Sequence, residues 1–302
     1  MSIRKNFRQI IAAPGMALAP GAYDALSARI IEAQGFDVMV AGGYAAMGAL
    51  LAAPDTGQSN MRDYADHYGR ICGAVNIPVY VDADTGFGGS NNVRQMVRAF
   101  EAAGVAGLFI SDQVFPNRCG YMAGKAVISA EEMMTKLKAA LDARRDPDLV
   151  IVARSDALGV EGIDAAIERC QMYMELGCDM AKPMGADAID EFKRVLREVP
   201  GPQLANLSHA NANWKSSMQD LEKAGAALCT FPSAALFAAV GGVARAMKAL
   251  KDHHSFETVQ SELSPLNDYY ELVGLDRQNA TENSYLAAAR AVIEKRTGAR
   301  KG

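Results

Sequence analysis

The chain has 302 residues, of which 50% are hydrophobic, 22% are charged and 27 are glycine. This composition excludes an intrinsically disordered chain, a collagen-like chain and a coiled coil. The formal net charge is −4, so the chain lacks the excess of basic residues that is typical of nucleic-acid-binding proteins, and we expect no nucleic-acid partner.

The N-terminal segment is interrupted by Arg4, Lys5 and Arg8, which predicts a short amphipathic helix instead of an export signal. No apolar run approaches the roughly 20 residues that span a bilayer. Five scattered cysteines without a CxxC pair predict reduced thiols. We therefore expect a soluble, cytoplasmic protein with no membrane association.

Short apolar runs recur along the chain at 16–19, 37–41, 78–81, 107–110, 149–153, 179–181, 203–205 and 227–231. Most of them are continuously apolar instead of alternating, which indicates parallel strands buried on both faces.

Segments of helical length separate these runs, at 22–33, 92–103, 129–144, 164–176, 188–196 and 233–250. Eight strand–helix units in roughly 250 residues predict a (β/α)8 TIM barrel. A doubly wound α/β sheet is the alternative, but it normally has fewer strands, and no GxGxxG motif follows the first run.

No linker divides the chain, so we expect one barrel domain over residues 1–302. The tail beyond Pro265 contains a further helix near 282–296, which follows the eighth helix and needs another surface to cover. We expect residues 265–302 to form a helical extension that contacts another subunit.

Acidic side chains follow the third and fourth runs, at the strand ends where barrels place reactive groups. Asp82 and Asp84 are two residues apart, so they point to the same side of a strand, and Asp112 follows the next run. Carboxylates held this close repel unless a cation lies between them, and oxygen ligands favour Mg²⁺, with Mn²⁺ as the alternative. The competing interpretation is that one aspartate caps the turn at Thr85-Gly86.

Cys119, Arg154 and His209 are further candidates. Cys119 lies beside Arg118 and Gly120, a setting that suits a reactive thiol, although isolated cysteines are usually small buried hydrophobes. Arg154 ends a buried strand and suits a bidentate clamp for a substrate carboxylate; the alternative is an ion pair with Asp156. His209 follows a strand end and is either functional or a structural hydrogen-bond donor.

Four motifs together resemble the isocitrate lyase and phosphoenolpyruvate mutase superfamily, most closely its 2-methylisocitrate lyase branch. They are VDADTGFG at 81–88, DQ at 112–113 with RCG at 118–120, ARSDA at 153–157, and VEGIDAAIER at 160–169. The resemblance implies a (β/α)8 barrel whose last helix is exchanged with a neighbouring subunit. It also implies a homotetramer built from two such swapped dimers.

The resemblance also implies roles for individual residues. It places Mg²⁺ at Asp82 and Asp84, with Asp55 as a further acid of that site. It makes Arg154 the ligand of the substrate carboxylate and Cys119 the acid that protonates the departing carbanion. The remaining positions that it places at the substrate are Gly42, Gly43, Tyr44, Asn206 and Ser208.

The sequence departs from the family pattern where the substrate would be selected. Expected acids are replaced by Ser111 and Met184, an expected histidine by Tyr121, and the segment after strand seven reads Asn206-Leu207-Ser208-His209 instead of Asn-x-Thr-Glu. The segment Gly42-Gly43-Tyr44, which the resemblance places at the substrate, begins with glycine instead of the serine of the family pattern. We therefore expect an altered substrate pocket.

We expect a Mg²⁺-dependent carbon–carbon lyase that cleaves a 2-hydroxy di- or tricarboxylate into a 2-oxo acid and a second carboxylic acid. Tyr44 and Tyr121 are the candidate bases, with His209 in a proton relay. The alternative is a decarboxylase or hydrolase of a 2-oxo acid on the same metal platform. A third interpretation is an effector-binding barrel without activity.

Overall fold

Eight parallel strands form the centre of one compact unit, Met1–Gly241, in the computed structural model, which describes residues 2–120, 122, 124–185, 188–208 and 217–298. The strands are β1 (Ala17–Pro20), β2 (Met39–Ala41), β3 (Val79–Asp82), β4 (Gly107–Ser111), β5 (Val150–Ser155), β6 (Met180–Pro183), β7 (Leu204–Asn206) and β8 (Leu228–Phe231). Each of them overlaps one of the predicted apolar runs.

The strands close into a ring. One sheet has the order β2-β3-β4-β5-β6 and the other the order β1-β8-β7, with all pairs parallel. Parallel bridges between Gly21 and Val40 and between Ala181 and Gln203 join the two sheets at both seams. The predicted TIM barrel is therefore confirmed, and the doubly wound sheet is excluded.

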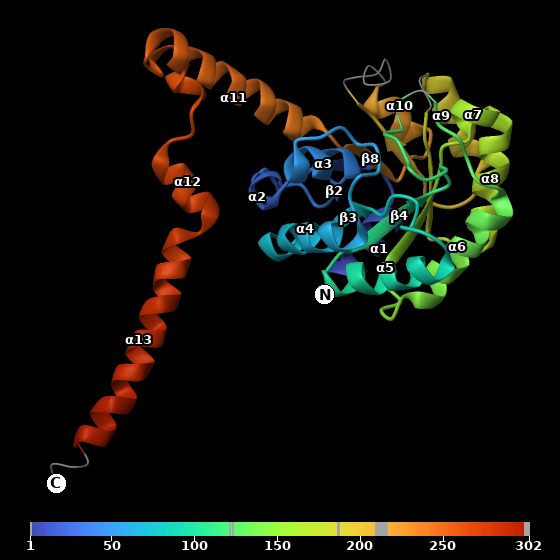
Figure 1. Cartoon of the computed structure of the whole chain (residues 1–302). Coiled ribbons are helices and arrows are strands. Elements are labelled where there is room, and N and C mark those ends of the chain that lie inside the picture. Colours follow the sequence, from blue (N-terminus) through green and yellow to red (C-terminus); the bar gives the residue numbers. More distant parts are fainter. Residues whose placement is uncertain (1, 121, 123, 186–187, 209–216, 299–302) are drawn as a thin grey trace. The chain divides into compact units, whose positions relative to one another are not determined.

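Helices surround the strands in this unit (Figure 1). They are α1 (Ile3–Ala12), α2 (Ala25–Ala33), α3 (Gly43–Leu51), α4 (Met61–Ala74), α5 (Ser90–Ala102), α6 (Ala130–Ala143), α7 (Leu158–Glu161), α8 (Ile163–Glu175), α9 (Ile189–Glu198) and α10 (Met218–Lys223). The next helix, α11 (Ala234–His253), begins after β8 and continues beyond this unit, which ends at Gly241. The Ser129 hydroxyl accepts the Glu132 N–H at 3.1 Å, and this N-cap fixes the start of α6.

The interior of the barrel is filled by alternate residues of the strands. One buried cluster contains Val40, Tyr80, Phe109 and Val152, each from a different strand. Every second residue of a strand points to the same side, so the strands together line the interior. Phe7 of α1 joins this cluster, and a Cβ at Gly107 would lie 2.7 Å from its ring. The N-terminal helix therefore packs against the inner cluster, and glycine at 107 makes room for it.

The chain divides into two compact units, Met1–Gly241 and Gly242–Gly302. The second unit holds the end of α11, a 3-10 helix (Glu257–Glu262), α12 (Leu266–Val273) and α13 (Leu275–Gly298). Arg245 and Glu262 form an ion pair within it at 2.9 Å. The single-domain organisation, the extension at 265–302 and the helix exchange stay predictions. Among the described residues, no helix has the length and apolarity needed to cross a bilayer.

Candidate active site

Polar side chains continue the inward-facing rows of the barrel at the carboxyl ends of the strands. Asp82 stands two residues after Tyr80, Arg154 after Val152, Lys182 after Met180 and Asn206 after Leu204, and the four earlier residues all belong to the inner cluster. Because residues two apart in a strand point to the same side, these four polar side chains face one space next to the apolar interior of the barrel.

This space is a cavity at the carboxyl end of the barrel. The residues predicted from sequence that line it are Gly42, Gly43, Tyr44, Asp55, Asp82, Cys119, Arg154 and Asn206. Lys182, Phe109 and Met184 line it as well and were not among the predicted site residues. Ser208 is buried just beyond Asn206, and Tyr121 and His209 lie outside the described residues.

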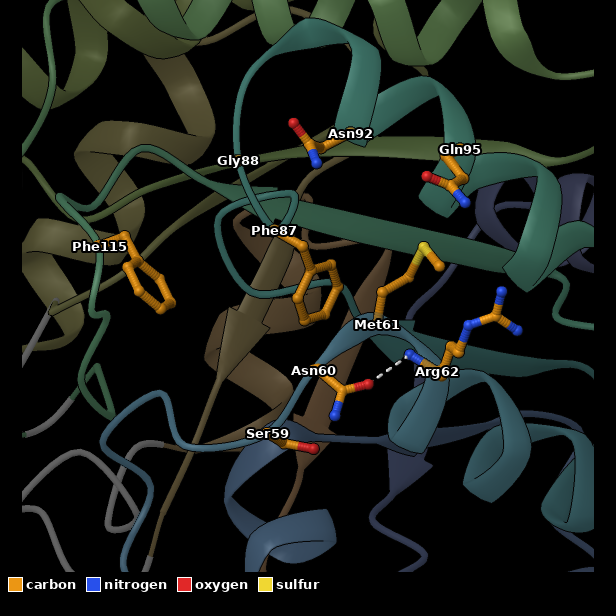
Figure 2. Close-up of a pocket in the computed structure, with 9 residues that line it drawn as sticks. All are labelled: Ser59, Asn60, Met61, Arg62, Phe87, Gly88, Asn92, Gln95 and Phe115. Carbon is orange, nitrogen blue, oxygen red and sulfur yellow. Dashed lines mark hydrogen bonds between the residues drawn. The ribbon is translucent and has the colours of Figure 1, made fainter.

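A larger hollow of about 570 Å³ is lined by side chains of a different character. Figure 2 shows the amides of Asn60, Asn92 and Gln95 together with Phe87 and Phe115 in this hollow. Among the residues that the structure describes, no acidic side chain lines it. The smaller cavity with Asp82 and Arg154 is therefore the candidate active site.

Asp82 is fixed by the backbone around it. Its Oδ2 accepts a hydrogen bond from the Gly43 N–H at 3.2 Å, and its Oδ1 accepts one from the Asp84 N–H at 2.9 Å. A Cβ at Gly43 would lie 3.1 Å from both Asp82 Oδ2 and the Tyr64 hydroxyl. Glycine at position 43 therefore lets the start of α3 approach this carboxylate.

Asp84 begins the turn that leaves β3, with a left-handed φ of 48°. Aspartate tolerates this conformation better than most residues. Its Oδ1 accepts a hydrogen bond from Asn117 Nδ2 at 2.9 Å. Burial, together with the nearby charges of Asp82 and Asp55, raises the pKa of Asp84 above its usual range.

Asp55 completes a crowded set of carboxylates. It is 5% exposed, and its Oδ1 has no hydrogen-bond partner. Burial and the Asp82 charge raise its pKa to about 7, although Arg154 opposes the shift. A buried set of carboxylates in which Asp82 disfavours the charged forms of both Asp84 and Asp55 fits a site for a divalent cation.

The described residues contain no group of three or more His, Cys, Asp or Glu side chains arranged to ligate one ion. A small number of protein ligands is compatible with Mg²⁺, which usually keeps several waters and takes one or two carboxylates. Asp82, Asp84 and Asp55 thus fit a hydrated Mg²⁺ better than a fully protein-ligated metal.

Asp112 lies apart from this set and does not line the cavity. Its Oδ2 accepts hydrogen bonds from Ser155 Oγ at 2.8 Å and from the Tyr173 hydroxyl at 3.2 Å, and its Oδ1 accepts the Asp156 N–H at 2.8 Å. Arg169 lies 3.5 Å from Oδ2. The structure therefore does not bring Asp112 to the other predicted metal ligands, because both of its oxygens hold the ends of β4 and β5 together.

Arg154 forms the ion pair that was the alternative to a substrate clamp. Its Nε and Nη2 donate to the two carboxylate oxygens of Asp156 at 2.7 and 3.1 Å. Its Nη1 lies 3.9 Å from Asp82 Oδ2. Asp156 therefore orients the guanidinium, and the remaining nitrogen lies on the side of Asp82.

Cys119 reaches the cavity on the loop after β4. A Cβ at the next residue, Gly120, would lie 2.6 Å from Met184 Cε and 2.9 Å from Arg154 Nη2. This glycine allows the loop to lie against the ends of β5 and β6. The Cys119 thiol and Arg154 consequently line the same space.

Known proteins resemble this chain over most of its length. The family model described as phosphoenolpyruvate phosphomutase matches residues 7–251. A 2,3-dimethylmalate lyase of Eubacterium barkeri is 35% identical over 94% of this chain and 99% of its own. A 2-methylisocitrate lyase of Aeropyrum pernix is 34% identical over 98% and 95%, respectively.

The chain belongs to the phosphoenolpyruvate mutase/isocitrate lyase superfamily. Among solved structures, 2,3-dimethylmalate lyase matches with a TM-score of 0.88 and 28% identity, over 94% of this chain and 96% of that one. Oxaloacetate acetylhydrolase in complex with 3,3-difluorooxalacetate matches with a TM-score of 0.89 and 26% identity, over 94% and 97%. These superfamily relatives confirm the expectation of an enzyme of the carbon–carbon lyase type.

Two departures from the superfamily pattern have clear structural consequences. Ser111, where the pattern has glutamate, donates a hydrogen bond to Asp156 Oδ2 at 3.0 Å and accepts one from the Gln113 N–H at 3.1 Å. Met184, where an acid was expected, lines the cavity. At Met184 the cavity therefore has an apolar side chain where the superfamily pattern has an acid, and Lys182 is a basic group in the same lining.

Lys182 is the site residue that sequence reasoning missed. The available signal was its position, since a charged residue directly after a buried strand run of a barrel faces the cavity. Burial and the nearby Arg154 lower its pKa to about 7.

Proposed function

We propose that the chain is a Mg²⁺-dependent lyase that cleaves a 2-hydroxy di- or tricarboxylate into a 2-oxo acid and a second carboxylic acid. The observation that carries the proposal is that Asp55, Asp82, Arg154 and Cys119 line one cavity at the carboxyl end of the barrel. Asp84, whose amide donates to Asp82, lies next to that lining. The metal would lower the pKa of the substrate hydroxyl as a Lewis acid.

The residues of the chain have separate tasks in this proposal. Asp82, held by the Gly43 and Asp84 amides, would bind the cation, with Asp84 and Asp55 binding its water ligands. Arg154, oriented by Asp156, would bind a carboxylate of the substrate. Tyr44 is the described candidate for the base, and its ring lies against Phe237 at 5.9 Å between centroids.

Cys119 would act after the carbon–carbon bond breaks. The electron pair of that bond remains on the leaving carbon, and the thiol would donate its proton there. A thiol suits this task because it is a much stronger acid than a hydroxyl. Lyases among the relatives of this chain act on 2-methylisocitrate and 2,3-dimethylmalate, and we extend only the shared 2-hydroxy carboxylate chemistry to it.

A second candidate is hydrolysis or decarboxylation of a 2-oxo diacid. The observations that favour it are the loss of acidic groups at Ser111 and Met184 and the likeness to oxaloacetate acetylhydrolase. The presence of Cys119 in the cavity favours the lyase.

The test is incubation with Mg²⁺ and a panel of 2-hydroxy and 2-oxo diacids, followed by product analysis by NMR. A 2-oxo acid formed from a 2-hydroxy diacid supports the lyase. Release of CO₂ or of a hydrolysis product from a 2-oxo diacid supports the second candidate. Binding without turnover of any compound contradicts both and supports the effector-binding barrel.

We also propose that the protein is a homotetramer assembled through its C-terminal helices. The support is the apolar surface of α13, where Tyr285, Leu286, Val292 and Ile293 are exposed in the single chain.

A further inference from the structure

Lys182 is a buried basic group without a carboxylate partner. It is 3% exposed and lies on the inner side of β6. Among the described residues, no carboxylate oxygen lies within 4.0 Å of its ammonium nitrogen, and no hydrogen bond from it is formed. The three other Lys and Arg side chains that are buried in the described part of the chain, at Lys136, Arg154 and Arg169, each have such a carboxylate.

Aromatic rings take the place of an acid beneath Lys182. Its nitrogen lies 3.4 Å from the centroid of the Phe109 ring and 5.7 Å from that of Tyr80. Ring faces attract a cation, but they replace only part of the hydration that a buried ammonium loses. The site would therefore gain from an anion supplied from outside the chain.

The barrel register sets the neighbours of this group. Arg154 and Lys182 are paired positions of the parallel strands β5 and β6, so two basic side chains lie side by side facing the cavity. Both are close enough to Cys119 for their charges to interact with its thiol. Asp156 already binds Arg154 through two hydrogen bonds, whereas no carboxylate of the described residues binds Lys182.

We propose that the Lys182 ammonium binds the second carboxylate of a 2-hydroxy dicarboxylate, the one carried by the fragment that leaves as a carbanion. This inference rests on the lyase function proposed above and names the substrate class and the residue that selects it. When the carbon–carbon bond breaks, its electron pair spreads from the leaving carbon onto this carboxylate. Lys182 would then face the growing charge while Cys119 protonates the carbon.

The lowered pKa of Lys182 is consistent with this role. Burial and Arg154 disfavour the charged form, and Asp82 and Asp156 offset only part of that effect. A carboxylate bound in contact would favour the ammonium form, because opposite charges at close range raise the pKa of a lysine.

The test compares the binding of malate and lactate in the presence of Mg²⁺ by calorimetry. Both acids carry the 2-hydroxy acid end, and only malate carries a second carboxylate. A hydrogen bond to a charged group corresponds to a preference for malate of about ten- to a hundredfold. We expect this preference in the wild type and expect Lys182→Met to abolish it while lactate affinity stays unchanged.

Two further variants make the comparison robust. Lys182→Gln tests the same loss of charge if the methionine variant fails to fold. Lys138→Met makes the same change at an exposed lysine that pairs with Asp142, and it should keep the preference for malate.

The outcomes separate this inference from the function on which it rests. If both Lys182 variants still prefer malate as strongly as the wild type, Lys182 does not bind the second carboxylate, and the lyase proposal stands. If the wild type binds neither acid in the presence of Mg²⁺, the 2-hydroxy acid site is wrong and the inference is overturned with it.

Discussion

Arg154 and Asp156 form a bidentate ion pair in which both residues are buried and both oxygens of the carboxylate are used. Lys125 approaches the same carboxylate at 3.1 Å. The result is that one acid holds two basic groups at the edge of the cavity. Although burial opposes both shifts, the charges of Arg154 and Lys125 keep the pKa of Asp156 well below its usual range, and Asp156 together with Asp82 raises the pKa of Arg154.

The first prediction concerns this pair. Asp156→Asn should destabilise the protein by about 3–5 kcal/mol, because it leaves the buried Arg154 guanidinium without its bidentate partner and also removes the acid that Lys125 contacts. It should also lower kcat/KM, since Arg154 loses its orientation. Thermal unfolding and steady-state kinetics measure the two effects. Asp164→Asn, which removes the exposed partner of Arg194, is the control and should cost about 1 kcal/mol or less.

The second prediction concerns the metal carboxylates. Asp84→Ala should abolish activity without unfolding the chain, since the aspartate would bind the hydrated cation. Removing one of three crowded acids relieves repulsion, and this gain offsets the lost Asn117 hydrogen bond and the cost of alanine at a left-handed φ, so the metal-free variant should stay folded. Activity measured with and without chelator, together with thermal unfolding, provides the check. A fully active variant after dialysis against chelator would contradict the metal site.

The third prediction tests the role of Cys119. Cys119→Ser should lower kcat by roughly 10²- to 10⁴-fold with KM little changed, because a hydroxyl is a weaker acid than a thiol. A small thiol alkylator should inactivate the wild type, and Mg²⁺ with substrate should protect it. Cys72→Ser, on α4 outside the cavity, is the matched control. Turnover of Cys119→Ser within a few-fold of the wild type would remove the thiol from the mechanism and weaken the lyase proposal.

The fourth prediction follows from the lowered pKa of Lys182. This pKa falls from 10.5 to about 7 in the folded protein, so between these values the unfolded chain binds more protons than the folded one. The free energy of unfolding should therefore rise with pH across this window, and Lys182→Met should lack that contribution. Denaturant unfolding of both proteins across the window measures the difference. A pH-independent difference between them would show that Lys182 keeps an ordinary pKa.

The fifth prediction concerns assembly. Truncation after Pro265 should reduce the oligomeric state more than it destabilises the barrel, because it removes the exposed apolar side chains of α13. Light scattering measures the oligomer, and circular dichroism measures the barrel. A truncated chain that stays tetrameric would contradict assembly through these helices.

The sequence by itself determined the architecture of the barrel and most of the lining of its cavity. Continuous apolar runs such as 149–153 identify buried parallel strands, and the residue that follows each run is placed at the carboxyl end by topology alone. Asp82, Arg154 and Asn206 could therefore be predicted to meet in one space, as the structure has them.

Only the tertiary structure decided which of these groups are paired with one another. Asp112 follows a strand just as Asp82 does, yet its oxygens are occupied by Ser155, Tyr173 and the Asp156 amide. Lys182 was recognisable in sequence only as a strand-end residue, and it faces Phe109 without an acid in contact. Such pairings depend on the register between neighbouring strands and on the loops above them, because a hydrogen bond requires atoms about 3 Å apart and local sequence patterns do not specify that distance.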